Sequence, residues 1–189
     1  MQTCDWLEAA KRLAGGEVGV VPTDTLYGIV GSALKPAAVE RVYELRRREL
    51  DKPMIVLIAG WTDFERLQIE IPARTQELLN KVWPGPVSVI VAVASPALAY
   101  LHRGTNSLAF RMPNHPELRE LLERVGPVVA PSANVAGEKP SETVEDARAY
   151  FGDEIFYVEG GKLSGSPSAL VDARPDPMRV LRPAPGFRL

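Results

Sequence analysis

The sequence contains one cysteine and two histidines in 189 residues. The lone Cys4 excludes an intrachain disulfide and a zinc site built from cysteines, and it is typical of a reducing compartment. Neither His102 nor His115 belongs to a Ser-His-Asp arrangement, and the carboxylates do not cluster as a metal cage requires. The sequence therefore offers no catalytic triad and no preformed metal site.

Long apolar runs and a strong net charge are also missing. No stretch approaches 18 apolar residues, and Asp5 and Glu8 interrupt the N-terminal segment, so we expect neither membrane spanning nor export. The formal net charge is −2 and the pI is about 5.8, so no overall field attracts nucleic acid. Hydrophobic residues make up 46% of the chain, which is enough for a single domain over residues 1–189. Because of its single cysteine, we expect this domain in the cytoplasm.

Short apolar runs and amphipathic segments alternate along the chain, which predicts an α/β fold. The apolar run 87–93 is expected to be a central strand covered on both faces. The other expected strands are 18–21, 29–33, 54–58, 107–111, 128–130, 155–158, 169–172 and 178–181. Seven helices are expected as well. The first buries the stripe Trp6, Leu7, Ala10, Leu13 and Ala14, and the third starts with a capping box at 62–65. The second begins at Pro36, the fourth spans 72–82, a short fifth lies at Ser95-Pro96, the sixth follows Pro116, and the seventh spans 144–151.

The segment 18–29 is the most informative one, because a buried strand stops at Pro22 and a Thr-Asp-Thr triplet follows. Such loops at strand ends are where open α/β sheets place their ligands. The alternative is that Thr23 and Asp24 only satisfy their own backbone in a turn.

A second informative segment is basic: Arg46-Arg47-Arg48 close a predicted helix, and Lys52 follows. Cations near a helix C-terminus are favoured by the macrodipole, and a solvated basic face is the common outcome. The same residues would also form a good clamp for polyphosphate.

Polar residues follow two further predicted strands. Arg111 closes one strand, and Ser132 and Asn134 follow another, where they can act either as helix caps or as ligand contacts. The small-residue loop from Gly160 to Ser168 permits close backbone approach. Because loops at one edge of a sheet converge, we expect these groups to share a pocket.

Five separated motifs together resemble the YrdC family over nearly the whole chain. They are Pro22-Thr23-Asp24-Thr25-Leu26-Tyr27-Gly28, the basic cluster before Lys52-Pro53-Met54-Ile55, Trp83-Pro84-Gly85-Pro86, Arg111-Met112-Pro113-Asn114-His115-Pro116 and Pro131-Ser132-Ala133-Asn134. The resemblance implies a twisted mixed sheet with flanking helices and a positively lined groove. It also implies synthesis of threonylcarbamoyl-AMP and pyrophosphate from L-threonine, bicarbonate and ATP, with Mg²⁺ arriving on ATP. The product would pass to partner proteins that modify tRNA.

The resemblance also implies the roles of individual residues. Arg46 and Arg48 would be catalytic. L-Threonine would be bound by Thr25, Arg111, Ala130 and Ser168. The nucleotide would be held by Arg48, Lys52, Ser107, Ser132, Asn134, Ser141 and Arg182.

Three positions depart from the family pattern. Arg46 replaces a lysine, Leu57 replaces a polar residue found in some relatives, and Ala169 removes one hydroxyl. Longer relatives continue into a second domain where this chain ends. Two other functions therefore stay open. One is a non-catalytic module that binds RNA and contacts tRNA directly, and the other is an inactive paralogue.

Overall fold

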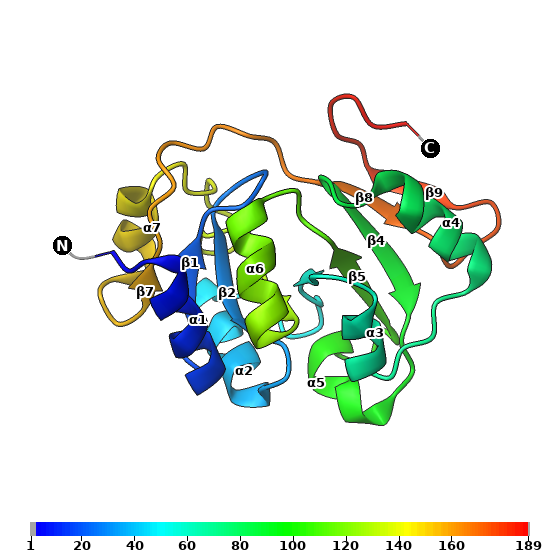
Figure 1. Cartoon of the computed structure of the whole chain (residues 1–189), viewed down its shortest axis with the longest axis horizontal. Coiled ribbons are helices and arrows are strands. Elements are labelled where there is room, and N and C mark those ends of the chain that lie inside the picture. The colour runs from blue at the N-terminus through cyan, green and yellow to red at the C-terminus, as the bar shows by residue number, and fades with distance from the viewer. Residues whose placement is uncertain (1–2, 189) are drawn as a thin grey trace.

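The computed structural model describes residues 3–188, and these form one mixed sheet with helices on both faces (Figure 1). The strands of the described part lie in the order β7-β1-β2-β6-β3-β5-β4-β8-β9. They are β1 (Gly19–Val21), β2 (Gly28–Ser32), β3 (Val56–Leu57), β4 (Val87–Ala92), β5 (Ser107–Arg111), β6 (Val128–Val129), β7 (Phe156–Tyr157), β8 (Ala169–Asp172) and β9 (Arg179–Arg182). The helices are α1 (Trp6–Gly15), α2 (Pro36–Arg46), α3 (Thr62–Arg66), α4 (Ala73–Val82), α5 (Ala99–His102) with a preceding 3₁₀ turn (Pro96–Leu98), α6 (Pro116–Val125) and α7 (Val144–Phe151). The predicted α/β class with a mixed sheet is confirmed.

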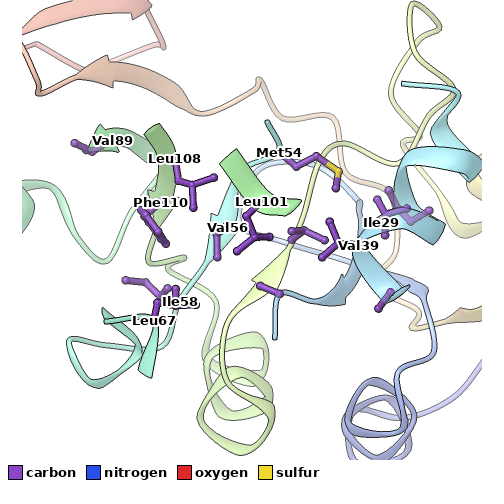
Figure 2. Close-up of a cluster of buried hydrophobic side chains, with 14 of the residues drawn as sticks. Ile29, Val39, Met54, Val56, Ile58, Leu67, Val89, Leu101, Leu108 and Phe110 are labelled. Atoms are coloured by element: carbon purple, nitrogen blue, oxygen red, sulfur yellow. The ribbon is translucent and has the colours of Figure 1, made fainter. Parts of the chain in front are cut away.

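Two hydrophobic cores lie on opposite faces of the sheet. Successive residues of β3 pack into different cores: Val56 belongs to the larger core and Leu57 to the smaller one. This follows from the alternation of side chains along a strand. Helices α1 and α6 cover the smaller core, whereas α2, α3, α4, α5 and α7 contribute to the larger one. Figure 2 shows the centre of the larger core, where Val56, Leu108 and Phe110 meet side chains from the helices.

Helix α1 begins and ends as its sequence indicates, but its buried stripe differs from the prediction. Asp5 accepts a hydrogen bond from the Glu8 N–H at the first turn, and Gly16 ends the helix with φ 99°. The buried residues are Ala9, Ala10 and Leu13, whereas Leu7 is 53% exposed, and Ala14 is exposed. The prediction for Leu7 and Ala14 was wrong, because the helix rests on the sheet through the adjacent stripe.

Two other local expectations need correction. Helix α3 exists, but it has no side-chain cap, since Asp63 is buried and accepts from the Ala59 N–H at 2.8 Å instead of closing a capping box. Strand β4 is flanked by β5 and β8, yet it stands seventh in the order, and Ala92 at its end is exposed. Its apolar run therefore marks an interior strand, not the middle of the sheet.

Among the helices of residues 3–188, none combines the length and the apolar character that crossing a membrane needs.

Candidate functional site

A cavity of about 200 Å³ opens beside the loop that joins β1 to β2. Its lining combines residues from seven stretches of the chain, and four of its side chains are arginines. The lining residues are Thr23, Thr25, Leu26, Tyr27, Gly28, Arg46, Arg48, Pro53, Met54, Ile55, Arg111, Ala130, Pro131, Ser132, Pro167, Ser168 and Arg182. The cavity thus gathers eight of the site residues that the sequence predicts.

These groups do not converge in the way that the sequence suggested. Strands β1 and β6 run in the same direction, because each is antiparallel to β2, but β5 runs opposite to them. The three loops therefore do not share one edge of a flat sheet. The end of β5 nevertheless reaches the β1–β2 loop, because Arg111 and the Asn114 N–H donate to Asp24, and Figure 1 shows the connection from β5 to α6 passing beside that loop.

Arg111 joins the two sides of this cavity. Its Nη1 donates to Thr25 Oγ1 at 3.0 Å, and its Nη2 donates to Asp24 Oδ1 at 2.9 Å. The residue is only 5% exposed, and burial lowers the pKa of its guanidinium although Asp24 opposes the effect. Its Nε is buried without a protein partner. The end of the cavity that Thr25 and Arg111 line is called the Arg111 end below.

The Thr-Asp-Thr loop is held by a turn of its own. The Thr23 hydroxyl donates to the Leu26 carbonyl at 2.7 Å and accepts from the N–H groups of Thr25 and Leu26. Thr23 thus satisfies the backbone of its own turn, while Thr25 lines the cavity with its hydroxyl 3.0 Å from both Thr23 Oγ1 and Arg111 Nη1. The backbone alternative therefore holds for Thr23 but not for Asp24, which accepts from Arg111 and from the Asn114 N–H, and the ligand-binding interpretation of the loop stays a prediction.

Ser168 also lines the cavity, and its hydroxyl contacts a residue that the sequence reasoning missed. Ser88 Oγ and Ser168 Oγ lie 2.9 Å apart, and both side chains are buried. Arg182 donates to the Ser168 carbonyl at 2.8 Å and to its hydroxyl at 3.3 Å. The signal for Ser88 was present, because a serine interrupts the valine-rich segment Val87–Ala92.

Arg46 lines the same cavity, and the part of the lining that it forms with Ser132 is called the Arg46 end. Its Nε donates to the Asn134 carbonyl at 3.0 Å, and its Nη2 donates to Asn134 Oδ1 at 3.2 Å and to Ser132 Oγ at 3.4 Å. The side chain is 4% exposed. Burial, together with the nearby charge of Arg48, lowers the pKa of Arg46 to about 10. A cation that is buried close to another cation, as Arg46 is to Arg48, is stabilised only by an anion or by neutral hydrogen-bond acceptors.

Arg48 and Lys52 act differently from each other. Arg48 lines the cavity and donates to the carbonyls of Lys52 and Pro53 at 2.9 and 3.1 Å. The Lys52 side chain is exposed and forms an ion pair with Glu49 at 2.7 Å. In this structure Lys52 therefore supports Arg48 through its backbone, and its contact with nucleotide stays a prediction.

Four other predicted site residues line no part of the cavity. Asn134 lies behind Arg46 and donates to the carbonyls of Val135 and Glu138 at 2.7 and 2.9 Å. The Ser141 hydroxyl donates to the Ala133 carbonyl. Ser107 begins β5, about 13 Å from Arg111 at the usual rise per residue. Lys52 is the fourth.

Two of the three departures from the family pattern are core residues. Leu57 is 1% exposed and packs in the core that α6 covers. Ala169 is fully buried in the other core. Neither lines the cavity, so the expectation that they remove substrate contacts finds no support in the lining. Arg46 is the one departure that the cavity contains.

The contacts of Ser132 and Asn134 predict different effects of alanine. Ser132→Ala removes a half-buried hydroxyl with one long contact, so ATP use should weaken while the melting temperature changes little. Asn134→Ala breaks a buried network, so we expect a loss of about 1–3 kcal/mol in the free energy of unfolding. Urea denaturation and the KM for ATP measure the two effects. Equal loss of stability in both variants, with activity kept, would show that both residues are only structural.

The segment from Glu159 to Ser168 lies across the β1–β2 loop, and Figure 1 shows it as the long orange connection to β8. Tyr27 holds it, since its hydroxyl donates to the Gly161 carbonyl at 2.8 Å and accepts from the Gly160 N–H at 2.9 Å. Gly165 is packed so closely that an added Cβ would lie 2.1 Å from the Thr25 carbonyl oxygen. This contact requires glycine.

Gly165→Ala should therefore displace either this segment or Thr25. We expect a destabilisation of about 1–3 kcal/mol, as overpacking usually costs, together with a several-fold weaker affinity for the ligand of the Arg111 end. Gly15→Ala is the matched control, because nothing lies within 4 Å of its added Cβ. An unchanged melting temperature and affinity in Gly165→Ala would contradict the contact.

The chemistry of this cavity suits anions more than metals. Its charged lining side chains are guanidinium groups, and its other polar side chains are hydroxyls. Within residues 3–188, no group of three or more His, Cys, Asp or Glu side chains is placed to hold a metal ion. The residues present can therefore orient a carboxylate at one end and phosphates at the other.

The chain is similar to proteins of a known family. A family model named Sua5/YciO/YrdC, described as telomere recombination, matches residues 11–184. The chain is 36% identical over 182 residues to a putative threonylcarbamoyl-AMP synthase of Mycobacterium tuberculosis, covering 95% of this chain and 83% of that protein. It is 35% identical over 181 residues to a threonylcarbamoyl-AMP synthase of Pyrococcus abyssi, covering 93% of this chain and 52% of that protein.

A solved structure is similar as well. The structure of P. abyssi Sua5 complexed with L-threonine superposes with a TM-score of 0.85 at 30% identity, covering 97% of this chain and 56% of that chain. This chain therefore spans about half the length of the P. abyssi protein. The likeness covers nearly every element described above.

Proposed function

Because the chain belongs to the Sua5/YciO/YrdC family, we propose that it makes threonylcarbamoyl-AMP and pyrophosphate from L-threonine, bicarbonate and ATP. Relatives named threonylcarbamoyl-AMP synthase cover most of the chain. The observation that carries the proposal is the cavity itself, which Thr25, Arg111 and Ser168 line together with Arg46, Arg48, Ser132 and Arg182. One end suits an amino acid and the other suits a nucleotide.

L-Threonine fits the Arg111 end. Arginine presents a planar fork that binds a carboxylate through two hydrogen bonds, and the unpartnered Nε of Arg111 is free to donate. The hydroxyls of Thr25 and Ser168 can bind the polar groups of the substrate, and Ala130 leaves room beside them. Support also comes from the P. abyssi structure, which was solved with L-threonine.

The proposed chemistry needs positioning and charge neutralisation, with no covalent intermediate. The threonine amine in its neutral form attacks the carbon of bicarbonate, and water leaves to give a carbamate. A carbamate oxygen then attacks the α-phosphorus of ATP and displaces pyrophosphate. Arg46, Arg48 and Arg182 would hold the phosphates and stabilise their charge in the transition state.

Mg²⁺ would accompany ATP in this proposal. The cavity offers cations and hydroxyls but no carboxylate in its lining, so phosphate oxygens and water are the ligands that remain for the ion. Bound in this way, Mg²⁺ would supply further charge neutralisation. The product would pass to tRNA threonylcarbamoyl-transfer proteins, and we propose that both act in the cytoplasm.

The test is direct. Purified protein is incubated with L-threonine, labelled bicarbonate, MgATP and pyrophosphatase, and the adenylate is detected by chromatography. We expect product that requires threonine and bicarbonate. ATP turnover that ignores threonine would contradict the synthase. Binding of tRNA without any adenylate would favour the non-catalytic module instead, and absence of both would favour the inactive paralogue.

Threonine should be preferred over serine. The two substrates differ by one methyl group, and such a group in an apolar niche is worth about 10–200-fold in kcat/KM. The small side chain of Ala130 provides the niche in the lining, whereas Ala169 lies in the core and cannot contribute. Competition assays with serine and valine measure the preference. Turnover of valine equal to that of threonine would show that the substrate hydroxyl is not read.

A further inference from the structure

Tyr43 is a buried side chain of α2 that the proposed chemistry does not use. It is 2% exposed, and its hydroxyl donates to the Lys52 carbonyl at 3.0 Å. Arg48 Nε donates to the same carbonyl at 2.9 Å, and Arg48 Nη2 donates to the Pro53 carbonyl at 3.1 Å. Tyr43 and Arg48 therefore share one acceptor, which the tyrosine holds from inside the larger core.

The turn that carries this shared carbonyl has few other contacts. Residues 49–52 follow α2, and all four are exposed. Within the turn, the Lys52 N–H donates to the Glu49 carbonyl at 3.3 Å, and the two side chains form an ion pair. In the described part of the chain, the hydrogen bonds that reach the turn from side chains outside it come from Arg48 and Tyr43. Without the Tyr43 hydroxyl, the turn and the Arg48 side chain would be free to move together.

The Tyr43 ring is itself held in place. The guanidinium of Arg103 lies over the ring, 4.2 Å from its centroid, and Arg103 forms an ion pair with Glu40 at 2.7 Å. Burial raises the pKa of the Tyr43 hydroxyl, although the charge of Arg103 opposes the effect. The hydroxyl therefore stays protonated at neutral pH and is a fixed donor.

Arg48 gains from such a fixed support. It lines the cavity close to the Arg46 end, since its charge acts on Arg46. An arginine side chain loses rotational freedom when a ligand orders it, and this loss weakens binding. Two carbonyls that are already in place hold the plane of the guanidinium before the ligand arrives. Its remaining N–H groups can then meet phosphate oxygens without further ordering.

We propose that Tyr43 is a positioning residue for the nucleotide, and that it orients Arg48 in the cavity through the Lys52 carbonyl. The inference rests on the proposed function, because it assigns a role in the binding of ATP. Tyr43 is outside the lining of the cavity, so it does not touch the nucleotide. Its hydroxyl raises the affinity for ATP by keeping the turn 49–52 in one position.

The chain contains a matched control for the test. Tyr100 is a half-buried tyrosine that packs against the same core, and its hydroxyl also donates to a backbone carbonyl, that of Ala33, at 2.7 Å. It does not line the cavity. Tyr43→Phe and Tyr100→Phe each delete one hydroxyl and one hydrogen bond to a carbonyl. Tyr100→Phe therefore measures what such a loss does to the fold.

Isothermal titration calorimetry tests the role of the hydroxyl with two ligands. One is MgATP without threonine or bicarbonate, and the other is L-threonine without ATP. In Tyr43→Phe we expect the Kd for MgATP to rise about 3- to 10-fold, the effect of one hydrogen bond, and the Kd for threonine to change less than about twofold. Tyr100→Phe should change neither value. Equal weakening of both ligands in Tyr43→Phe, or equal weakening of MgATP binding in both variants, would mean that the hydroxyl serves only the fold and would overturn the inference.

A double-mutant cycle with Arg48→Ala tests the path of the effect. If Tyr43 acts through Arg48, Tyr43→Phe should weaken MgATP binding less than about twofold once the arginine is gone. Variants that bind weakly are titrated with excess nucleotide, with the stoichiometry fixed at one. An equal loss from Tyr43→Phe in both backgrounds would show that the effect bypasses Arg48, and the inference would be wrong.

These binding measurements separate the inference from the function on which it rests. A wild type that binds no MgATP overturns both. Adenylate formation together with an unchanged Kd for MgATP in Tyr43→Phe overturns only the role of Tyr43. Because phenylalanine fills nearly the same volume as tyrosine, we expect the variant to fold and to bind threonine, which keeps the comparison valid.

Discussion

Replacing Arg46 with alanine is expected to lower kcat/KM for ATP by about 10- to 150-fold, the equivalent of one charge-assisted contact worth roughly 1.5–3 kcal/mol. The side chain lines the cavity and holds Ser132 and Asn134 through three donated hydrogen bonds. Its removal therefore takes away a phosphate contact and loosens the loop that carries two others. Steady-state kinetics with ATP varied at saturating threonine measures the effect.

Arg47→Ala is the neighbouring control. Arg47 is exposed, and it caps α2 in the left-handed conformation with φ 49°. Its side chain does not line the cavity, so synthesis should survive. If Arg46→Ala and Arg47→Ala both leave synthesis intact and both weaken RNA binding, the basic cluster is a nucleic-acid surface and the phosphate clamp is wrong.

Arg46→Lys asks whether charge or shape matters at this position. Lysine restores the residue of the family pattern, and it keeps the positive charge as a single nitrogen. The structure shows that Arg46 donates from two different nitrogens to groups on both Ser132 and Asn134. We therefore expect a smaller loss than with alanine. A loss equal to that of alanine would mean that the planar fork is essential here.

Much of the fold could be predicted, because it depends on local signals. Helix α7 occupies the range 144–151 that its apolar pattern indicates, and its capping box at Thr143 and Asp146 fixes the start. Gly16 ends α1 in the left-handed region as expected. Strand order and direction depend on distant pairing, which a single sequence does not encode in any short pattern. That is why β4 was placed in the centre and β5 was assumed to share an edge with β1.

The site shows the same division. The resemblance brought Thr25 and Arg111 to one site, and they are in contact at 3.0 Å. Asp24 was treated only as a turn residue, because its role comes from a partner 87 positions away. Lys52 contributes its carbonyl to Arg48, and any residue type has a carbonyl. Local sequence patterns do not reveal contacts made by the backbone or contacts between side chains that are far apart in the sequence.

Arg111→Ala is expected to have the largest effect on threonine. Removing the protein's side of a buried, hydrogen-bonded charge pair with its ligand, here Arg111 with the substrate carboxylate, typically costs about 2–5 kcal/mol of binding, which corresponds to roughly 30- to 5,000-fold in affinity. The variant leaves Asp24 without its cation and deprives the substrate carboxylate of its fork. The affinity for threonine, measured by calorimetry, should fall by this factor, while the affinity for ATP should change far less, because Arg46 and Arg48 remain.

Arg103→Ala is the control, because it measures the effect of removing a buried arginine that is bound to a carboxylate but lies outside the cavity. Arg103 also donates from Nη2 to a carboxylate, that of Glu40, at 2.7 Å, and its Nε is likewise buried without a partner. It stacks on Tyr43 and does not line the cavity. Both variants should lose stability, but only Arg111→Ala should lose threonine. If the two variants lose threonine affinity equally, the effect comes from a weakened fold, and Arg111 does not bind the substrate carboxylate.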